Sequence, residues 1–217
     1  MKDDICVTGI VLSAMPIGEY DKRLIILTRE LGKVHAFARG ARRQNSALLA
    51  AGQPFTFGKF FLRPGKDAYT LTGAKVQNYF MELRTDIEIL YYGYYFLEVG
   101  DFFGQEGLDE SETLKLIYMS CRALVSRNEA LSVRLIKNIF DYKMLAIEGY
   151  VAAEMPQEET AGLSNGAMYA LSYICNSKEE KLYTFTVSDE VLTEMEGFID
   201  KYRKKYMDGH FKSLEML

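Results

Sequence analysis

The sequence predicts an α+β protein of two domains: a five-stranded β-barrel over residues 1–80 and an α-helical domain over residues 81–217. Five short apolar runs recur in the first 80 residues at intervals of roughly ten residues, as in a small barrel or sandwich. From about residue 82 the apolar residues recur instead at the three- and four-residue spacing of helices. The charge changes at the same place. Residues 1–80 carry 12 Lys and Arg against 6 Asp and Glu, whereas residues 81–217 carry 14 against 24.

The five expected strands are separated by residues that favour turns. They cover residues 5–12, 24–28, 33–39, 55–63 and 69–76, and the breaks include Met15-Pro16-Ile17-Gly18, Glu30-Leu31-Gly32 and Arg63-Pro64-Gly65. An Ala- and Leu-rich stretch at 44–51 predicts a short helix between the third and fourth strands. Five strands with a helix after the third is the arrangement of an OB-fold.

The third strand carries the clearest alternation in the chain. Side chains of successive strand residues point to opposite faces, so Val34, Ala36 and Ala38 form one small apolar face suited to a core. The opposite face carries Lys33, His35, Phe37 and Arg39. Cations that neutralise phosphates, interleaved with rings that stack on bases, are what a nucleic-acid binder without sequence preference needs.

The basic first third of the chain indicates a polyanionic partner. The candidate DNA-binding residues are Lys22, Arg23, Lys33, His35, Phe37, Arg39, Arg42, Arg43, Arg63 and Lys66. The alternative is a solvated edge strand whose charges only discourage aggregation. The rings among the cations favour nucleic-acid binding over that alternative.

The second part of the chain is expected to consist of helices over residues 87–103, 113–125, 129–147 and from Ser188 onward. The aromatic residues of the first stretch could also serve a strand, but its length and its lack of turn residues favour a helix. Asp109 or Ser111 can cap the second, and Gly149 can end the third, which is expected to be the buried central helix. The stretch 151–165 is expected to be a loop. Four cations in this part, Arg122, Arg127, Arg134 and Lys137, are interpreted either as members of surface ion pairs or as the rim of a groove for an acidic-hydrophobic peptide. The ion pairs are the favoured interpretation.

No catalytic motif is found: the chain lacks a Walker A loop, a GxSxG elbow, an HExxH pair and a GxGxxG loop. Glu19 and Asp21 are a pair of acids that a metal-dependent nuclease could use, but the adjacent Lys22 and Arg23 favour ion pairs. Three scattered cysteines argue against both a disulfide framework and a zinc site. We therefore expect a non-catalytic protein without metal or cofactor, located in the cytoplasm because neither a signal peptide nor a membrane-spanning run is present. A protein–protein scaffold with a basic barrel remains the main alternative, and a nuclease is a less favoured one.

Several segments in order resemble one bacterial family. Val7-Thr8-Gly9-Ile10-Val11-Leu12, Glu19-Tyr20-Asp21-Lys22, Leu27-Thr28-Arg29-Glu30-Leu31-Gly32-Lys33 and Ala38-Arg39-Gly40-Ala41-Arg42 are similar to the N-terminal domain of the RecO family of DNA repair proteins. The resemblance is strong over the first 80 residues and looser beyond them. It implies an OB-fold followed by a helical domain, working in the bacterial nucleoid.

The same resemblance implies a recombination mediator that binds single- and double-stranded DNA and anneals complementary strands. It implies two protein partners, RecR and the acidic C-terminal tail of single-strand-binding protein, and a role in loading the recombinase RecA. Many members of the family carry a four-cysteine zinc site after the segment that matches Gly149-Tyr150. Here that region reads Met155-Pro156-Gln157-Glu158-Glu159-Thr160 and then Gly166-Ala167-Met168, so the chain resembles a zinc-free variant.

Overall fold

The computed structural model describes residues 3–217, which form two compact units. The first unit contains the residues up to Arg84 together with Leu97–Leu114, and the second contains Thr85–Phe96 together with Lys115–Leu217. The domain boundary at residue 80 stays a prediction, because a compact unit need not be a domain that folds by itself.

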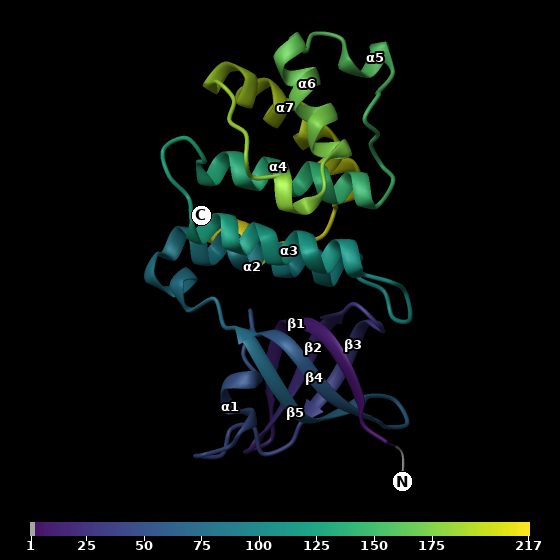
Figure 1. Ribbon diagram of the computed structural model, residues 1–217, viewed down its shortest axis with the longest axis vertical. Coiled ribbons are helices and arrows are strands. Elements are labelled where there is room, and N and C mark those ends of the chain that lie inside the picture. Colours follow the sequence, from purple (N-terminus) through teal and green to yellow (C-terminus); the bar gives the residue numbers. More distant parts are fainter. Residues whose placement is uncertain (1–2) are drawn as a thin grey trace. The chain divides into compact units, whose positions relative to one another are not determined.

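The first unit is built on a closed five-stranded barrel (Figure 1). Its strands are β1 (Ile5–Ile17), β2 (Asp21–Thr28), β3 (Gly32–Ala38), β4 (Phe57–Pro64) and β5 (Tyr69–Asn78), joined in the order β1-β2-β3-β5-β4. All neighbours are antiparallel except β3 and β5, which are parallel over two residue pairs, Ala36 with Tyr69 and Phe37 with Thr70. The short helix α1 (Leu48–Ala51) lies between β3 and β4. The predicted OB-fold is therefore confirmed.

The interior of the barrel confirms the alternation in the third strand. Val34, Ala36 and Ala38 are fully buried, whereas His35 and Phe37 between them are exposed. The barrel core also contains Val7, Val11, Leu24, Ile26, Phe60, Leu62 and Leu71. Burial of a small apolar face on every strand is what fixes the register, since a slip by one residue would turn the charged face inward.

The segment 97–114 of the first unit covers one end of the outer face of β2 and β3. The Lys33 amide donates to the Gln105 carbonyl at 2.9 Å, and the Gly107 amide donates to the Leu31 carbonyl at 3.0 Å. A Cβ at Gly104 would lie 3.0 Å from Leu27 and 3.5 Å from the Lys33 side chain. The exposed part of the β2–β3 face is therefore the part that carries Arg23, His35, Phe37 and Arg39.

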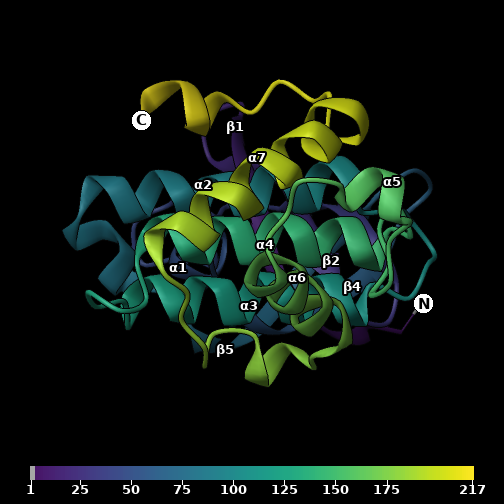
Figure 2. The ribbon, with the colours of Figure 1, turned by 90° about the horizontal axis from the view of Figure 1, so that it is seen from above.

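All of the elements that follow β5 in the chain are helical. The elements are η1 (Met81–Thr85), α2 (Ile87–Phe103), α3 (Ser111–Val125), α4 (Val133–Ile147), α5 (Gln157–Thr160), α6 (Asn165–Asn176), η2 (Glu179–Lys181), α7 (Asp189–Tyr206) and η3 (Lys212–Met216). Figure 2 shows α7 running obliquely past α4, against which it packs, with α6 seen nearly end-on. The four predicted helices are confirmed, and α4 is the buried one. Within residues 3–217, no helix is both long and apolar enough to cross a membrane.

One predicted helix starts later than expected, the predicted loop 151–165 contains the short helix α5, and a further helix was not predicted. The third predicted helix begins at Val133 and not at residue 129, because the Ser132 hydroxyl accepts the Leu135 amide and caps it there. The Asn128 side chain holds the preceding turn by accepting the amides of Ala130 and Leu131. The helix α6 was not predicted at all; it starts where the predicted loop ends, capped by the Ser164 hydroxyl, which accepts the Ala167 amide.

A candidate nucleic-acid interface

One row of outward-facing residues crosses the barrel from strand to strand. The register pairs Met15 with Arg23, Arg23 with Phe37, Phe37 with Thr70, and Thr70 with Arg63. Residues directly opposite each other in neighbouring strands lie on the same face of the sheet. The row therefore sets a ring between a cation and a hydroxyl, and Phe37 and Met15 keep 38% and 55% of their surface exposed.

Several cations around this row have no acidic partner among residues 3–217. Arg23 lies in the row, Arg39 follows β3, Arg43 lies in the turn after it, and Lys66 is at the tip of the β4–β5 loop; all four are exposed. The β2–β3 face and the β1–β2 and β4–β5 loops are the parts of an OB-fold that bind oligonucleotides and oligosaccharides. Arg23, Arg39, Arg43 and Lys66 thus lie at the part of the fold that usually meets a ligand.

The turn after β3 is held against the start of β2. The Gly40 amide donates to Asp21 Oδ1 at 2.7 Å, and the Arg42 guanidinium donates to the Gly18 carbonyl at 3.1 Å. Arg42 remains exposed despite this bond. These contacts keep Arg39, Arg42 and Arg43 on a defined turn next to the β2–β3 face.

A shallow hollow of about 310 Å³ lies beside the other end of the exposed face. It is lined by His35, residues 64–69 and Glu106. The pairing of β3 with β5 is what brings His35 close to Lys66 across the β4–β5 loop. His35 and Lys66, which are far apart in sequence, thus share one concave surface.

The structure corrects the prediction for Lys22. Only 9% of the residue is exposed, and its ammonium donates to the Gly52 carbonyl at 2.9 Å. Burial, and after it the charge of Arg42, lowers the pKa of Lys22. Lys22 and Arg23 are adjacent on one strand, so their side chains must point to opposite faces. Lys22 is therefore not part of the candidate site.

Two further predicted cations are engaged within the first unit. The Lys33 ammonium contacts Asp101, donating to its carbonyl at 2.5 Å and lying 3.1 Å from its Oδ1. Arg63 pairs with Asp4 at 2.9 Å, and the Thr72 hydroxyl donates to the same carboxylate at 2.7 Å. Arg63 remains half exposed and stays in the candidate site, whereas the paired Lys33 keeps only 23% of its side chain exposed and is not retained.

The two acids of the nuclease alternative have other roles. Asp21 accepts the Gly40 amide, and the neighbouring Glu19 carboxylate raises the pKa of the Tyr20 hydroxyl. Among residues 3–217, no group of three His, Cys, Asp or Glu side chains is placed to hold a metal ion. The cysteines do not fit a zinc site either: Cys6 is exposed on β1, Cys121 is buried on α3 and Cys175 is half-buried on α6.

In the second unit, three of the four cations considered for a peptide site are paired with acids of that unit. Arg127 pairs with Asp86, Arg134 donates to Glu196 at 2.9 and 2.5 Å, and Lys137 lies 2.7 Å from the fully buried Asp141. Arg122 alone of the four is exposed without an acidic partner among the described residues. This agrees with the favoured interpretation, surface ion pairs, for three of them.

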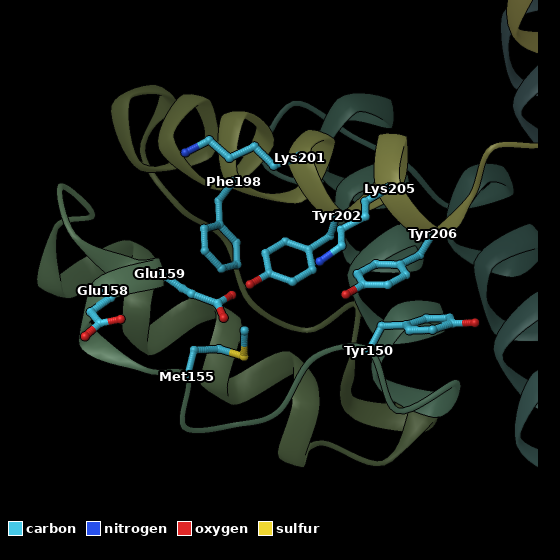
Figure 3. A pocket seen from close by; sticks show the side chains of 9 residues that line it. All are labelled: Tyr150, Met155, Glu158, Glu159, Phe198, Lys201, Tyr202, Lys205 and Tyr206. Atoms are coloured by element: carbon cyan, nitrogen blue, oxygen red, sulfur yellow. The ribbon is translucent and has the colours of Figure 1, made fainter.

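The second unit also has a hollow of about 390 Å³ lined by rings, shown in Figure 3. The rings of Tyr150 and Tyr206 are stacked at 4.2 Å, and Lys205 lies 4.8 Å from the centre of the Tyr206 ring. Glu159 points toward the ring of Tyr202 in Figure 3. Sequence reasoning missed this hollow because its residues come from α5, α7 and the connection after α4.

The closed barrel and the helical unit, joined in one chain, place the protein in the class of OB-fold proteins with an added helical unit. A family model described as "Recombination protein O N terminal" matches residues 1–80. The chain is 31% identical to the DNA repair protein RecO of Alkaliphilus metalliredigens over 85% of this chain and 76% of that protein. It is 28% identical to the RecO of Clostridium perfringens strain 13 and 26% identical to that of Acetivibrio thermocellus, in each case over more than nine-tenths of both chains. The chain belongs to the RecO family of DNA repair and recombination proteins.

Proposed function

We propose that this chain is a recombination mediator that binds single- and double-stranded DNA through the β2–β3 face of its barrel and anneals complementary strands. In this proposal the protein acts without catalysis, metal or cofactor, in the nucleoid of the cytoplasm. With RecR it helps to load RecA onto DNA that is coated with single-strand-binding protein.

The observation that carries the proposal is the row Met15, Arg23, Phe37, Thr70 and Arg63 with the unpaired cations around it. A cation without an acidic partner is available for a phosphate, and an exposed ring is available for a base. The proposed phosphate contacts are Arg23, Arg39, Arg42, Arg43 and Lys66, and also Arg63, which is half exposed although it pairs with Asp4. The proposed base contacts are His35 and Phe37.

Annealing follows from the same chemistry. Two DNA strands repel each other, and cations that neutralise phosphates lower this repulsion and release counterions. Rings that stack on a base leave its hydrogen-bonding edge free to pair with another strand. No bond is made or broken in the process, so the protein needs only charge, geometry and exposed rings.

The test is a titration of DNA affinity against salt for Arg39→Ala and Arg23→Ala. Each lost phosphate contact should reduce the slope of log affinity against log salt by about one unit. Lys75→Ala is the matched control, because Lys75 is exposed on β5 opposite Lys59 and outside the proposed face. Equal slopes for the two arginine variants and the wild type would overturn the assignment of this face.

A strand-annealing assay separates the proposal from the alternative of a protein–protein scaffold with a basic barrel. A scaffold has no reason to accelerate pairing of complementary strands, whereas the proposed mediator does so and loses the effect in Arg23→Ala. Release of labelled fragments in the presence of Mg²⁺ would instead favour the nuclease alternative.

The helical unit is proposed to bind the partner proteins. Of the four cations considered for the acidic tail of single-strand-binding protein, Arg122 is the best placed, because the other three are already paired with acids. Titration of a labelled acidic tail peptide should show weaker binding to Arg122→Ala and little change for Lys59→Ala. Binding that ignores Arg122 would reject this residue as the contact.

A further inference from the structure

We infer that Tyr20, in the β1–β2 loop, is a base-stacking residue that binds an unpaired nucleobase beyond the one on Phe37. The inference rests on the proposed DNA-binding face and adds to it a residue and a ligand: the planar surface of a single-stranded base. Tyr20 is an exposed ring in a loop that hydrogen bonds hold in place.

The loop that carries Tyr20 is tied to the turn after β3 by three hydrogen bonds. The Arg42 amide donates to the Tyr20 carbonyl at 2.8 Å, the Arg42 guanidinium donates to the Gly18 carbonyl, and the Gly40 amide donates to Asp21. The conformational entropy of the loop is therefore already lost before any ligand binds, which is the condition for a preorganised contact.

The Tyr20 ring itself is covered on one side by a cation. The Arg43 guanidinium carbon lies 5.1 Å from the ring centre, within the range of a cation–π contact. The ring remains 42% exposed, although a large apolar surface gains free energy when it is buried. No aromatic partner stacks on the Tyr20 ring within residues 3–217.

The position of Tyr20 suits a strand that already lies on the row through Phe37. Tyr20 precedes Arg23 by three residues, roughly 10 Å at the rise of a β-strand. The exposed Arg39 follows Phe37 by two residues at the same end of the β2–β3 ladder. One strand can thus place a base on Phe37, phosphates on Arg39 and Arg43, and a later base on Tyr20.

Two carboxylates flank Tyr20 and oppose phosphate binding, Glu19 and Asp21, and Asp21 is engaged by the Gly40 amide. The Arg43 guanidinium sits over the Tyr20 ring. The 42% of Tyr20 that stays exposed leaves ring surface available to a ligand. Stacking on a ring surface tolerates any base, because every base has a planar face.

The experiment compares Tyr20→Leu and Tyr20→Phe with wild type on three DNA ligands. They are a single strand that contains 2-aminopurine, a single strand of the same length in which every site is abasic, and a duplex. The chain contains no Trp, so the probe is read without tryptophan emission. Tyr79→Leu is the matched control, since Tyr79 is a 40% exposed tyrosine of the same unit at the far end of β5.

Tyr20→Leu should bind the intact single strand roughly ten-fold more weakly and quench the probe less. It should bind the abasic strand and the duplex within about two-fold of wild type, because neither presents an unstacked base. Tyr20→Phe and Tyr79→Leu should match wild type on all three ligands. Tyr20→Ser should repeat the result of Tyr20→Leu, which keeps the test decisive if leucine alters the loop.

Wild-type affinity of Tyr20→Leu for the intact strand would overturn this inference and leave the proposed function standing. An equal loss on the intact and abasic strands would also overturn it, because the residue would then act on the backbone or on the fold. Failure of the wild-type protein to bind any of the three ligands would instead overturn the proposed function, and this inference with it.

Discussion

Lys22 and Arg23 show how one position along a strand decides what a cation does. Lys22 turns toward Gly52 at the end of the barrel beside α1, and Arg23 turns outward into the row with Phe37. Both are equally basic in the sequence. Their roles differ because neighbouring side chains of a strand face opposite ways.

Lys22→Met should leave the salt slope of DNA affinity unchanged, whereas Arg23→Met should lower it by about one unit. The physical reason is that the buried ammonium of Lys22 cannot reach a phosphate without breaking its bond to Gly52. Fluorescence anisotropy with one oligonucleotide over a range of salt concentrations measures both slopes. A slope that is lowered by the same amount in both variants would show that the burial of Lys22 is not maintained in solution.

Asp4 is one residue through which the stability of the first unit should depend on pH. Hydrogen bonds from Thr72 and then Arg63 lower the pKa of Asp4 below 3.8. A lowered carboxyl pKa contributes stability that is present above the ordinary value and is lost as the pH falls through the lowered one. Asp4→Asn should therefore remove part of the loss of stability below about pH 4, measured as melting temperature against pH. A Glu112→Gln control, at an exposed acid of α3, should keep it.

Residue-scale patterns account for much of the candidate site. The alternation of Lys33 to Arg39 predicts which side chains face outward, and the structure agrees for His35, Phe37 and Arg39. Met15, Thr70 and Tyr20 were not predicted, because their places depend on cross-strand register and on loop contacts that alternation within one strand does not encode. The pairing of Lys33 with Asp101 was not predicted either, because 68 residues separate the two in the sequence.

At the scale of elements, the barrel depends on the close approach of β3 to the segment that follows α2. Gly32 has φ +67°, and a Cβ on it would lie 2.1 Å from the Gln105 carbonyl oxygen. The same place carries the bond from Lys33 to Gln105. A glycine is needed here both for the backbone conformation and for the contact.

Gly32→Ala should destabilise the protein by more than about 1 kcal/mol, because strain and a backbone clash add. Gly107→Ala separates the two causes: Gly107 has φ +77° but no atom within 4 Å of the added Cβ, so this variant carries only the strain. Urea unfolding measures both. Equal costs for the two variants would mean that segment 97–114 does not press on β3.

The helices divide according to the strength of their local signals. α3 and α7 have long apolar stripes, whereas α2 is apolar on most sides and was predicted from its length and its lack of turn residues. For α7 the predicted Ser188 cap is observed, with its hydroxyl accepting the Val191 amide. α6 has the same kind of cap in Ser164 and buries Ala167, Ala170, Leu171 and Ile174 on one face. It escaped prediction because Gly166 stands in its first turn and its apolar face is made partly of small residues, which weakens the periodic pattern.

At the scale of the whole molecule, the formal charge of −4 conceals the basic first third of the chain. A local cluster of cations steers a polyanion even when the net charge is negative. The association rate with single-stranded DNA should therefore fall as salt rises, and the fall should be smaller for Arg39→Ala. Stopped-flow mixing measures both rates, and a rate independent of salt would contradict steering.

The parallel pairing of β3 with β5 is the shortest join in the barrel, two residue pairs long, and Phe37 and Thr70 form one of them. A short ladder opens more readily than a long one, because fewer hydrogen bonds hold it. In the proposed function, a DNA strand bound along the row from Met15 to Arg63 would cross the β3–β5 pairing and contact residues of both strands. Because a ligand that binds only the folded state raises its stability, the backbone amides along β3 and β5 should exchange their hydrogens more slowly once DNA is bound.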